Sequence, residues 1–102
     1  MATTRLERGN VSRVANAWNG LFSGTLTATT TPQPLSTTSR HIMEVLVQND
    51  PDGQTAVFIG DVRRQLYQLN GGGNVTVKVN DLSVVYVRTD AGTATVNYLA
   101  FE

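Results

Sequence analysis

The chain of 102 residues contains no cysteine, one histidine and one tryptophan. Without cysteine, neither a disulfide framework nor a thiolate metal site can form, so packing and backbone pairing must hold the fold together. The eight basic and eight acidic residues cancel, which removes the broad positive field that binding to a phosphate backbone requires. We therefore expect no nucleic-acid partner.

Long apolar runs are also missing. The longest, at 84–87 and 98–101, are far too short to span a bilayer. Residues 1–10 contain no apolar core of a signal peptide, so we expect neither a membrane partner nor an export address. A chain of this length is typically one domain that buries only about two thirds of its unfolded surface, so association between copies would add stability.

No set of residues is arranged for catalysis. His41 is the only histidine and has only Glu44 near it at a ligand spacing, which favours a surface position at the start of a strand over a chemical role. The glycines at 71–73 lack the ending of a phosphate loop, and no Gly-x-Ser-x-Gly motif occurs. The segment 50–53 is similar to the start of a calcium loop but lacks the later ligands, which favours a turn. We predict no catalytic residue, no cofactor and no metal ion.

The chain after the first 20 residues is a series of short β-segments separated by turns. Strands are predicted at 26–30, 42–49, 55–59, 75–79, 83–89 and 93–101, with a looser extended segment at 62–69. Asp, Asn and Gly at 50–53, 70–74 and 90–92 predict the turns. Strands that recur about every 8 to 12 residues without an intervening helix predict an all-β antiparallel sandwich, of jelly-roll or related type, over residues 21–102.

Alternation within two of these strands predicts which side chains face the core. The segment 75–79 alternates valine with polar residues, and Val77 at its centre is expected to point inward and not to tolerate a charge. In the strand at 42–49, one face is expected to carry Met43, Val45 and Val47.

Residues 1–20 are predicted to form an N-terminal arm. Apolar residues recur at helical spacing between Asn10, a good helix N-cap, and Gly20, so a short helix is expected when the arm is docked. Trp18 either closes the core of its own chain, which is favoured, or anchors a partner. Arginine suits planar, bidentate contacts with protein surfaces, and the arm carries Arg5, Arg8 and Arg13.

A second group of candidate contact residues follows the third predicted strand. Arg63, Arg64 and Tyr67 have a composition enriched in protein interfaces and in sugar or phosphate contacts, although a solvated strand face explains them equally well. The predicted partner-binding set is therefore Arg5, Arg8, Arg13, Trp18, Arg63, Arg64 and Tyr67.

Five segments resemble, in strand pattern and turn placement, small structural proteins encoded by tailed bacteriophages: 45–49, 57–60, 69–73, 75–87 and 92–100. Proteins of that kind are β-sandwich components of the virion. Several are decoration or cement proteins that sit on the head lattice, often as trimers, and others attach to tail or fibre parts.

The resemblance implies a non-enzymatic virion protein, made in the host cytoplasm, that binds the major capsid protein or another virion protein. It also implies a homo-oligomer, with a trimer favoured, and a role in capsid decoration ahead of a tail or fibre role. The alternative from another class is a carbohydrate-binding module in which Tyr67, Tyr86 and the pair Arg63 and Arg64 line one groove.

Overall fold

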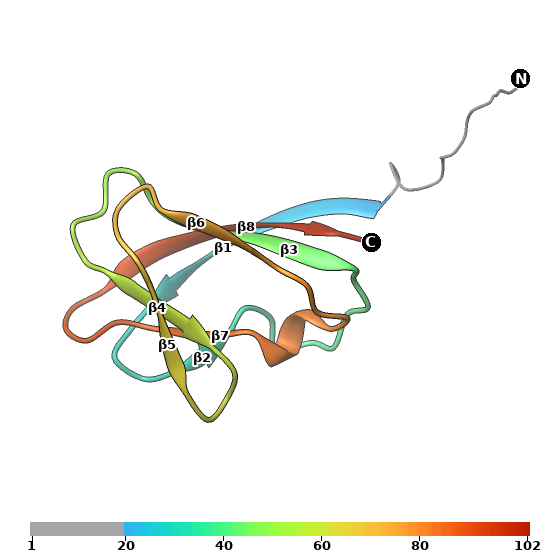
Figure 1. Cartoon of the computed structure of the whole chain (residues 1–102), viewed down its shortest axis with the longest axis horizontal. Helices are drawn as coiled ribbons and strands as arrows, with labels where there is room; N and C mark the ends of the chain where they lie inside the picture. Colours follow the sequence, from blue (N-terminus) through green and yellow to red (C-terminus); the bar gives the residue numbers. More distant parts are fainter. Residues whose placement is uncertain (1–19) are drawn as a thin grey trace, which may run out of the picture.

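The computed structural model describes residues 20–102. The predicted arm, with Arg5, Arg8, Arg13 and Trp18, lies outside the described residues except for Gly20. The described part is built from strands and the short 3-10 helix η2 (Figure 1). Their bounds are β1 Leu21–Ala28, β2 Gln33–Pro34, β3 Glu44–Asn49, β4 Val57–Gly60, β5 Gln65–Leu69, β6 Asn74–Val77, η2 Leu82–Val84, β7 Tyr86–Arg88 and β8 Ala94–Phe101. Within this part, no helix is long and apolar enough to cross a bilayer.

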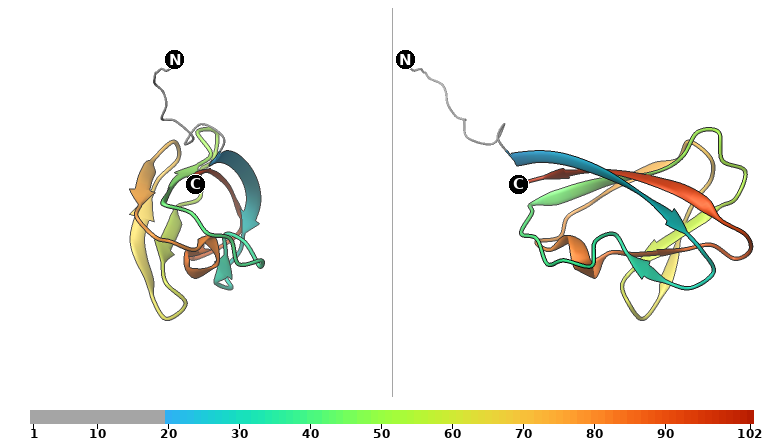
Figure 2. Two further views of the ribbon diagram at one scale, coloured as in Figure 1. Left: turned by 90° about the vertical axis from the view of Figure 1, so that its right-hand side faces the viewer. Right: turned by 180° about the vertical axis from the view of Figure 1, so that it is seen from behind.

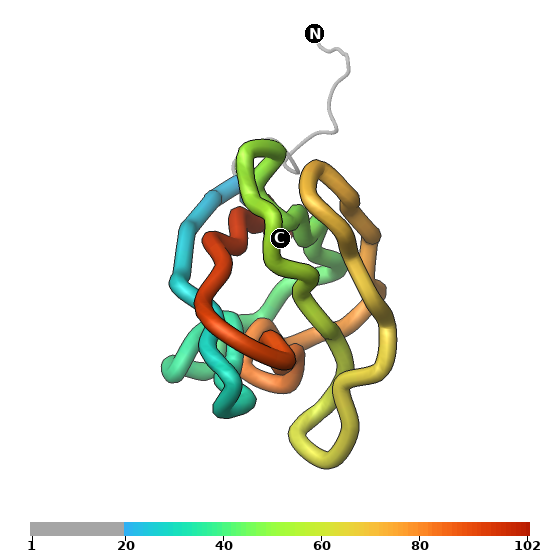
Figure 3. The backbone as a smooth tube through the Cα atoms, turned by 90° about the vertical axis from the view of Figure 1, so that its left-hand side faces the viewer, coloured from blue at the N-terminus to red at the C-terminus, as the bar shows by residue number. Residues whose placement is uncertain are grey.

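The strands form two antiparallel four-stranded sheets, with the orders β1-β8-β3-β6 and β2-β7-β4-β5. The sheets lie face to face as two layers (Figure 2), and the backbone winds around the core between them (Figure 3). The hydrogen-bonded pairs β1–β8, β2–β7, β3–β6 and β4–β5 are those of one long hairpin rolled into two sheets, which is the jelly-roll arrangement. The predicted all-β antiparallel sandwich is confirmed.

The core is made by the inward-facing side chains of both sheets. In the first sheet, β8 lies between β1 and β3, and its register places Val96 beside Leu26 and Asn49. Cross-strand neighbours share a face, so these rows point together into the sandwich. The largest fully buried side chains include Ile42, Leu82, Val45, Val47, Val57, Val87 and Val96. The inward face predicted for 75–79 is correct.

Two predictions about local structure are wrong. Met43 is 70% exposed, because regular pairing of β3 begins only at Glu44 and the irregular start shifts the alternation by one residue. Ile42 takes the buried position instead. The predicted strand at 83–89 starts as η2, because the Asp81 side chain accepts a hydrogen bond from the Ser83 amide and caps a helical turn there.

The two flanks of the sandwich, each formed by one edge strand from either sheet, are covered differently. On the flank of β1 and β2, the Thr89 amide donates to the Thr29 carbonyl (2.8 Å), and Ala28 and Leu35 are buried. On the flank of β5 and β6, the inward-facing side chains Val75, Val77 and Tyr67 remain partly exposed or exposed. We call these the closed flank and the open flank.

Candidate functional site

The hairpin that joins β4 to β5 projects from the body of the jelly roll (Figure 1). Its turn is organised by Asp61, whose Oδ1 accepts hydrogen bonds from the amides of Arg64 (3.0 Å) and Arg63 (2.9 Å). The Asp61 amide in turn donates to the Arg64 carbonyl (3.1 Å). The amides of Arg64 and Arg63 hold the pKa of the Asp61 carboxyl below its usual value. The turn is therefore held by hydrogen bonds among its own residues.

This turn displays two arginines among exposed apolar side chains. The side chain of Arg63 is 83% exposed and pairs only at 3.4 Å with Asp61, and Arg64 is also exposed. Val62 and Leu66 flank them and are exposed as well. Arginine beside apolar side chains is a composition typical of protein interfaces. Because the backbone of the turn is already held, little backbone entropy is lost when a partner binds.

The structure separates Tyr67 from the two arginines. Tyr67 pairs with Ile59, which places it on the inward face of the second sheet at the open flank, where it is 57% exposed. Tyr86 pairs with Gly60 on the opposite, outward face. The single platform that a carbohydrate-binding module would make from Tyr67 and Tyr86 is therefore not formed.

A groove that sequence reasoning did not find runs along the open flank, between the two sheets. Its volume is about 380 Å³, and its lining residues are Ile59, Gly60, Asp61, Tyr67, Val75, Val77, Val79, Val84 and Val85. All are apolar apart from Asp61 and the Tyr67 hydroxyl. Alternation in the sequence identifies the inward face of a strand but not whether the other sheet covers it, so the prediction that Val77 points inward does not reveal the groove.

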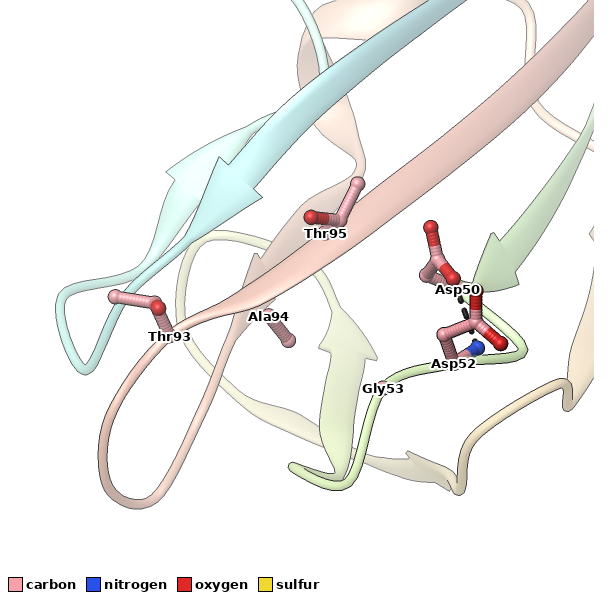
Figure 4. A pocket seen from close by; sticks show the side chains of 6 residues that line it. All are labelled: Asp50, Asp52, Gly53, Thr93, Ala94 and Thr95. Atoms are coloured by element: carbon pink, nitrogen blue, oxygen red, sulfur yellow. Dashed lines mark hydrogen bonds between the residues drawn. The ribbon is translucent and has the colours of Figure 1, made fainter.

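The turn at 50–53 forms a second, polar hollow of about 290 Å³ with Thr93 and Thr95 (Figure 4). The Asp50 carboxylate accepts a hydrogen bond from the Asp52 amide (2.9 Å), and the Asp50 carbonyl accepts from the Gly53 amide (2.9 Å). The predicted turn is confirmed, and its carboxylate is engaged by the backbone. Among residues 20–102, no three His, Asp or Glu side chains are placed to share a metal ion.

Asp81, which the sequence analysis did not identify as a candidate, accepts several hydrogen bonds. Its oxygens accept from the Ser39 hydroxyl, from the amide and hydroxyl of Ser83 (2.9 and 2.8 Å) and from the Arg40 amide (3.3 Å). These donors, Ser39 foremost, hold the pKa of Asp81 far below its usual value. His41, which is exposed, forms a backbone bridge with Asp81. The cluster fixes the start of η2.

A family-model comparison and a comparison with curated proteins both returned no match to this chain.

Proposed function

We propose that this chain is a non-enzymatic structural protein of a tailed-bacteriophage particle, a decoration protein that binds the assembled head shell. The observation that carries the proposal is the projecting turn of Asp61, Val62, Arg63 and Arg64, held rigid on a jelly-roll scaffold. The phage resemblance of 45–49, 57–60 and the later segments supplies the virion setting. The proposed location is the virion, after synthesis in the host cytoplasm.

The contact would be made by shape and charge. Arg63 and Arg64 can form bidentate hydrogen bonds with carboxylates of the major capsid protein, while Val62 and Leu66 bury apolar surface beside them. Because Asp61 already fixes the backbone of the turn, docking orders few additional backbone torsions. Many copies on one lattice would convert a modest single contact into firm attachment. The arm residues Arg5, Arg8, Arg13 and Trp18 belong to the same proposal as a second contact.

The test adds purified chain to head shells that lack it. We expect wild-type protein to co-sediment with the shells and to raise the temperature at which they burst. A double variant, Arg63→Ala with Arg64→Ala, should bind about tenfold more weakly or worse, since truncated interface arginines commonly cost that much. Lys78→Ala is the matched control, because Lys78 is an exposed cation just after β6, outside the arginine turn.

A second variant separates the arm from the turn. Deletion of residues 1–19 should leave melting of the jelly roll unchanged and weaken shell binding, and unchanged shell occupancy would remove the arm from the mechanism. Uptake by tails or fibres in place of heads would move the protein to that part of the particle. A thermal shift with an oligosaccharide, together with no uptake by any particle, would replace the proposal with the carbohydrate-binding alternative.

A further inference from the structure

One edge of the first sheet is free along the groove. Within residues 20–102, β6 is hydrogen-bonded only to β3. The Asn49 amide donates to the Gly73 carbonyl (2.9 Å), and bonded positions recur every second residue in an antiparallel pair. The odd-numbered residues 73–77 therefore direct their backbone groups to β3, and the even-numbered residues 74–78 direct theirs to the free edge.

The other edge strands lack this combination. The edge strand β2 has two residues, Gln33 and Pro34, and follows Pro32. The pairing of β5 with β4 is broken by a register shift at Gly60. Prolines, short strands and bulges protect sheet edges from pairing with another chain. The edge strand β1 is unprotected, but none of its residues lines the apolar groove, whereas Val75 and Val77 of β6 do. Among the edge strands within residues 20–102, only β6 combines an unprotected edge with an apolar groove.

We infer that β6 is a self-association edge: two copies of the chain pair β6 with β6 in antiparallel fashion, about a two-fold axis at Thr76. The first sheets of the two copies would then form one continuous sheet across the axis. The inward side chains of each β6 would lie against the groove of the other copy.

The backbone groups at the free edge allow a register centred on Thr76. An axis at Thr76 places Thr76 opposite Thr76 of the second copy, and Asn74 opposite Lys78 of that copy. All of these residues direct amides and carbonyls to the free edge, so each pair exchanges two hydrogen bonds. An axis at Val75 or Val77 also pairs even-numbered residues with each other, but it places Val77 opposite Gly73 or Thr76 opposite Lys78, so the side chains decide between these registers.

Side chains favour the same register. Val75 lies opposite Val77 of the second copy on the groove side, and threonine pairs with threonine on the outward face. Lys78 faces an amide, whereas an axis at Lys78 would bring two lysines together. β6 is thus complementary to itself in this register, which its hydrogen bonds also allow.

The groove has the chemistry that a second copy requires. Exposed apolar side chains, Tyr67 and Val84, line its mouth. A two-fold axis brings this patch against itself, so apolar surface meets apolar surface. Asp61 is the only charged lining residue, and its carboxylate is already engaged by the turn and by Arg63. No unpaired charge in the groove opposes its burial.

This pairing does not rest on the proposed shell-binding role, because it uses the β6 edge and not the arginine turn. It yields a dimer, whereas the resemblance implies a trimer. Solution mass therefore distinguishes the two directly.

The experiment measures mass by sedimentation over a range of concentrations, with charges placed on the axis. Wild type should be a dimer. Thr76→Lys and Thr76→Glu should each raise the dimer dissociation constant about tenfold or more, because like charges meet at the axis. An equimolar mixture of the two variants should recover a one-to-one dimer, because opposite charges then meet. Thr76 is exposed, so both variants should melt like wild type.

The matched controls are Thr27→Lys and Thr27→Glu. Thr27 is an exposed threonine with the same backbone orientation on β1, the other edge of the same sheet. These variants should leave the dimer intact. If the charged Thr76 variants fail to fold, Thr76→Pro, which removes only the amide at the free edge, replaces them.

Four results would overturn the inference. They are a monomeric wild type at its highest soluble concentration, a trimer, a dimer that survives both charged variants, and a mixture of the two variants that stays monomeric. If β6 paired with a strand of another protein but not with a second copy of this chain, the groove would be assigned to that other protein.

Discussion

The closed flank and the open flank are built from similar strands but differ in what lies across the sandwich from them. On the closed flank, Ala28 and Leu35 are buried, and the link between β1 and β2 is hydrogen-bonded to Thr89. On the open flank, Val75 and Val77 alternate just as regularly, yet the facing strand β5 leaves them partly exposed. An alternating strand can thus serve either as core or as a surface for another chain. Substitutions on each flank test that difference.

The first test places a charge in the buried core and another at the open flank. Val47→Asp should unfold the domain, because Val47 has no exposed surface and an unpaired buried charge costs more than about 4 kcal/mol. Val77→Asp should cost only about 1 to 2 kcal/mol, because its carboxylate can reach water through the groove. This replaces the sequence-based expectation that Val77 does not tolerate a charge. Urea unfolding of each variant measures the loss.

The comparison must be made on the monomer, so both aspartates are placed in the Thr76→Lys background. Equal destabilisation there would mean that the groove is closed within a single copy.

Two glycines provide a second test, because an added Cβ has no room at one and open space at the other. A Cβ on Gly60, at the register shift beside the groove, would collide with the carbonyl oxygen of Arg64. Gly60→Ala should therefore cost about 3 kcal/mol or more. Gly92 adopts a φ of +72° but has no atom within 4 Å of an added Cβ, so Gly92→Ala should cost about 1 kcal/mol. Thermal melts would rank the two, and the reverse order would contradict the close approach at Gly60.

Two arginines extend the comparison to charged side chains. Arg88 is only 23% exposed, lies 4.6 Å from the centre of the Phe58 ring and donates to the Gln65 carbonyl (2.9 Å). Arg88→Ala should cost about 1 to 2 kcal/mol through these lost contacts. Arg64→Ala should change stability by no more than about 0.5 kcal/mol, because its side chain is exposed. Similar losses in chemical denaturation would mean that Arg64 has a structural role.

Acid should loosen one end of the open flank. Asp81 caps η2, whose Val84 lines the groove. Because its pKa is lower in the folded than in the unfolded chain, Asp81 stabilises the fold above the usual carboxyl pKa of about 3.9, and that contribution fades as the pH falls below it. Asp61 acts in the same direction.

Asp81→Asn should flatten the dependence of the melting temperature on pH below about 4, the usual carboxyl range. Ser39→Ala, which removes the strongest donor to Asp81, should flatten it in part. An unaltered pH profile in Asp81→Asn would show that other carboxylates govern acid unfolding.

The sequence predicts the elements that local rules determine. Alternation identifies the inward face of β8, and glycine allows the positive φ of Gly72 and Gly92 in the predicted turns. Local rules fail where distant residues intervene. Met43 turns outward because β3 begins only at Glu44, and η2 replaces a strand because Asp81 caps it.

The candidate contact residues show the same limit of local rules. Composition marks Arg63 and Arg64 as candidates, and both lie exposed on one turn. Tyr67 is near them in the chain, but strand alternation turns it toward the groove. The groove itself depends on the distance between two sheets, which no local pattern records.

The two ends of the described chain are hydrogen-bonded to each other, and this determines how the fold responds to mechanical force. The Glu102 amide donates to the Gly20 carbonyl (2.6 Å), and β1 and β8 run antiparallel from that point. Tension applied between Gly20 and Glu102 would load these hydrogen bonds one after another and peel β1 from β8 like a zipper. The described part of the chain should therefore yield readily to a pull between Gly20 and Glu102.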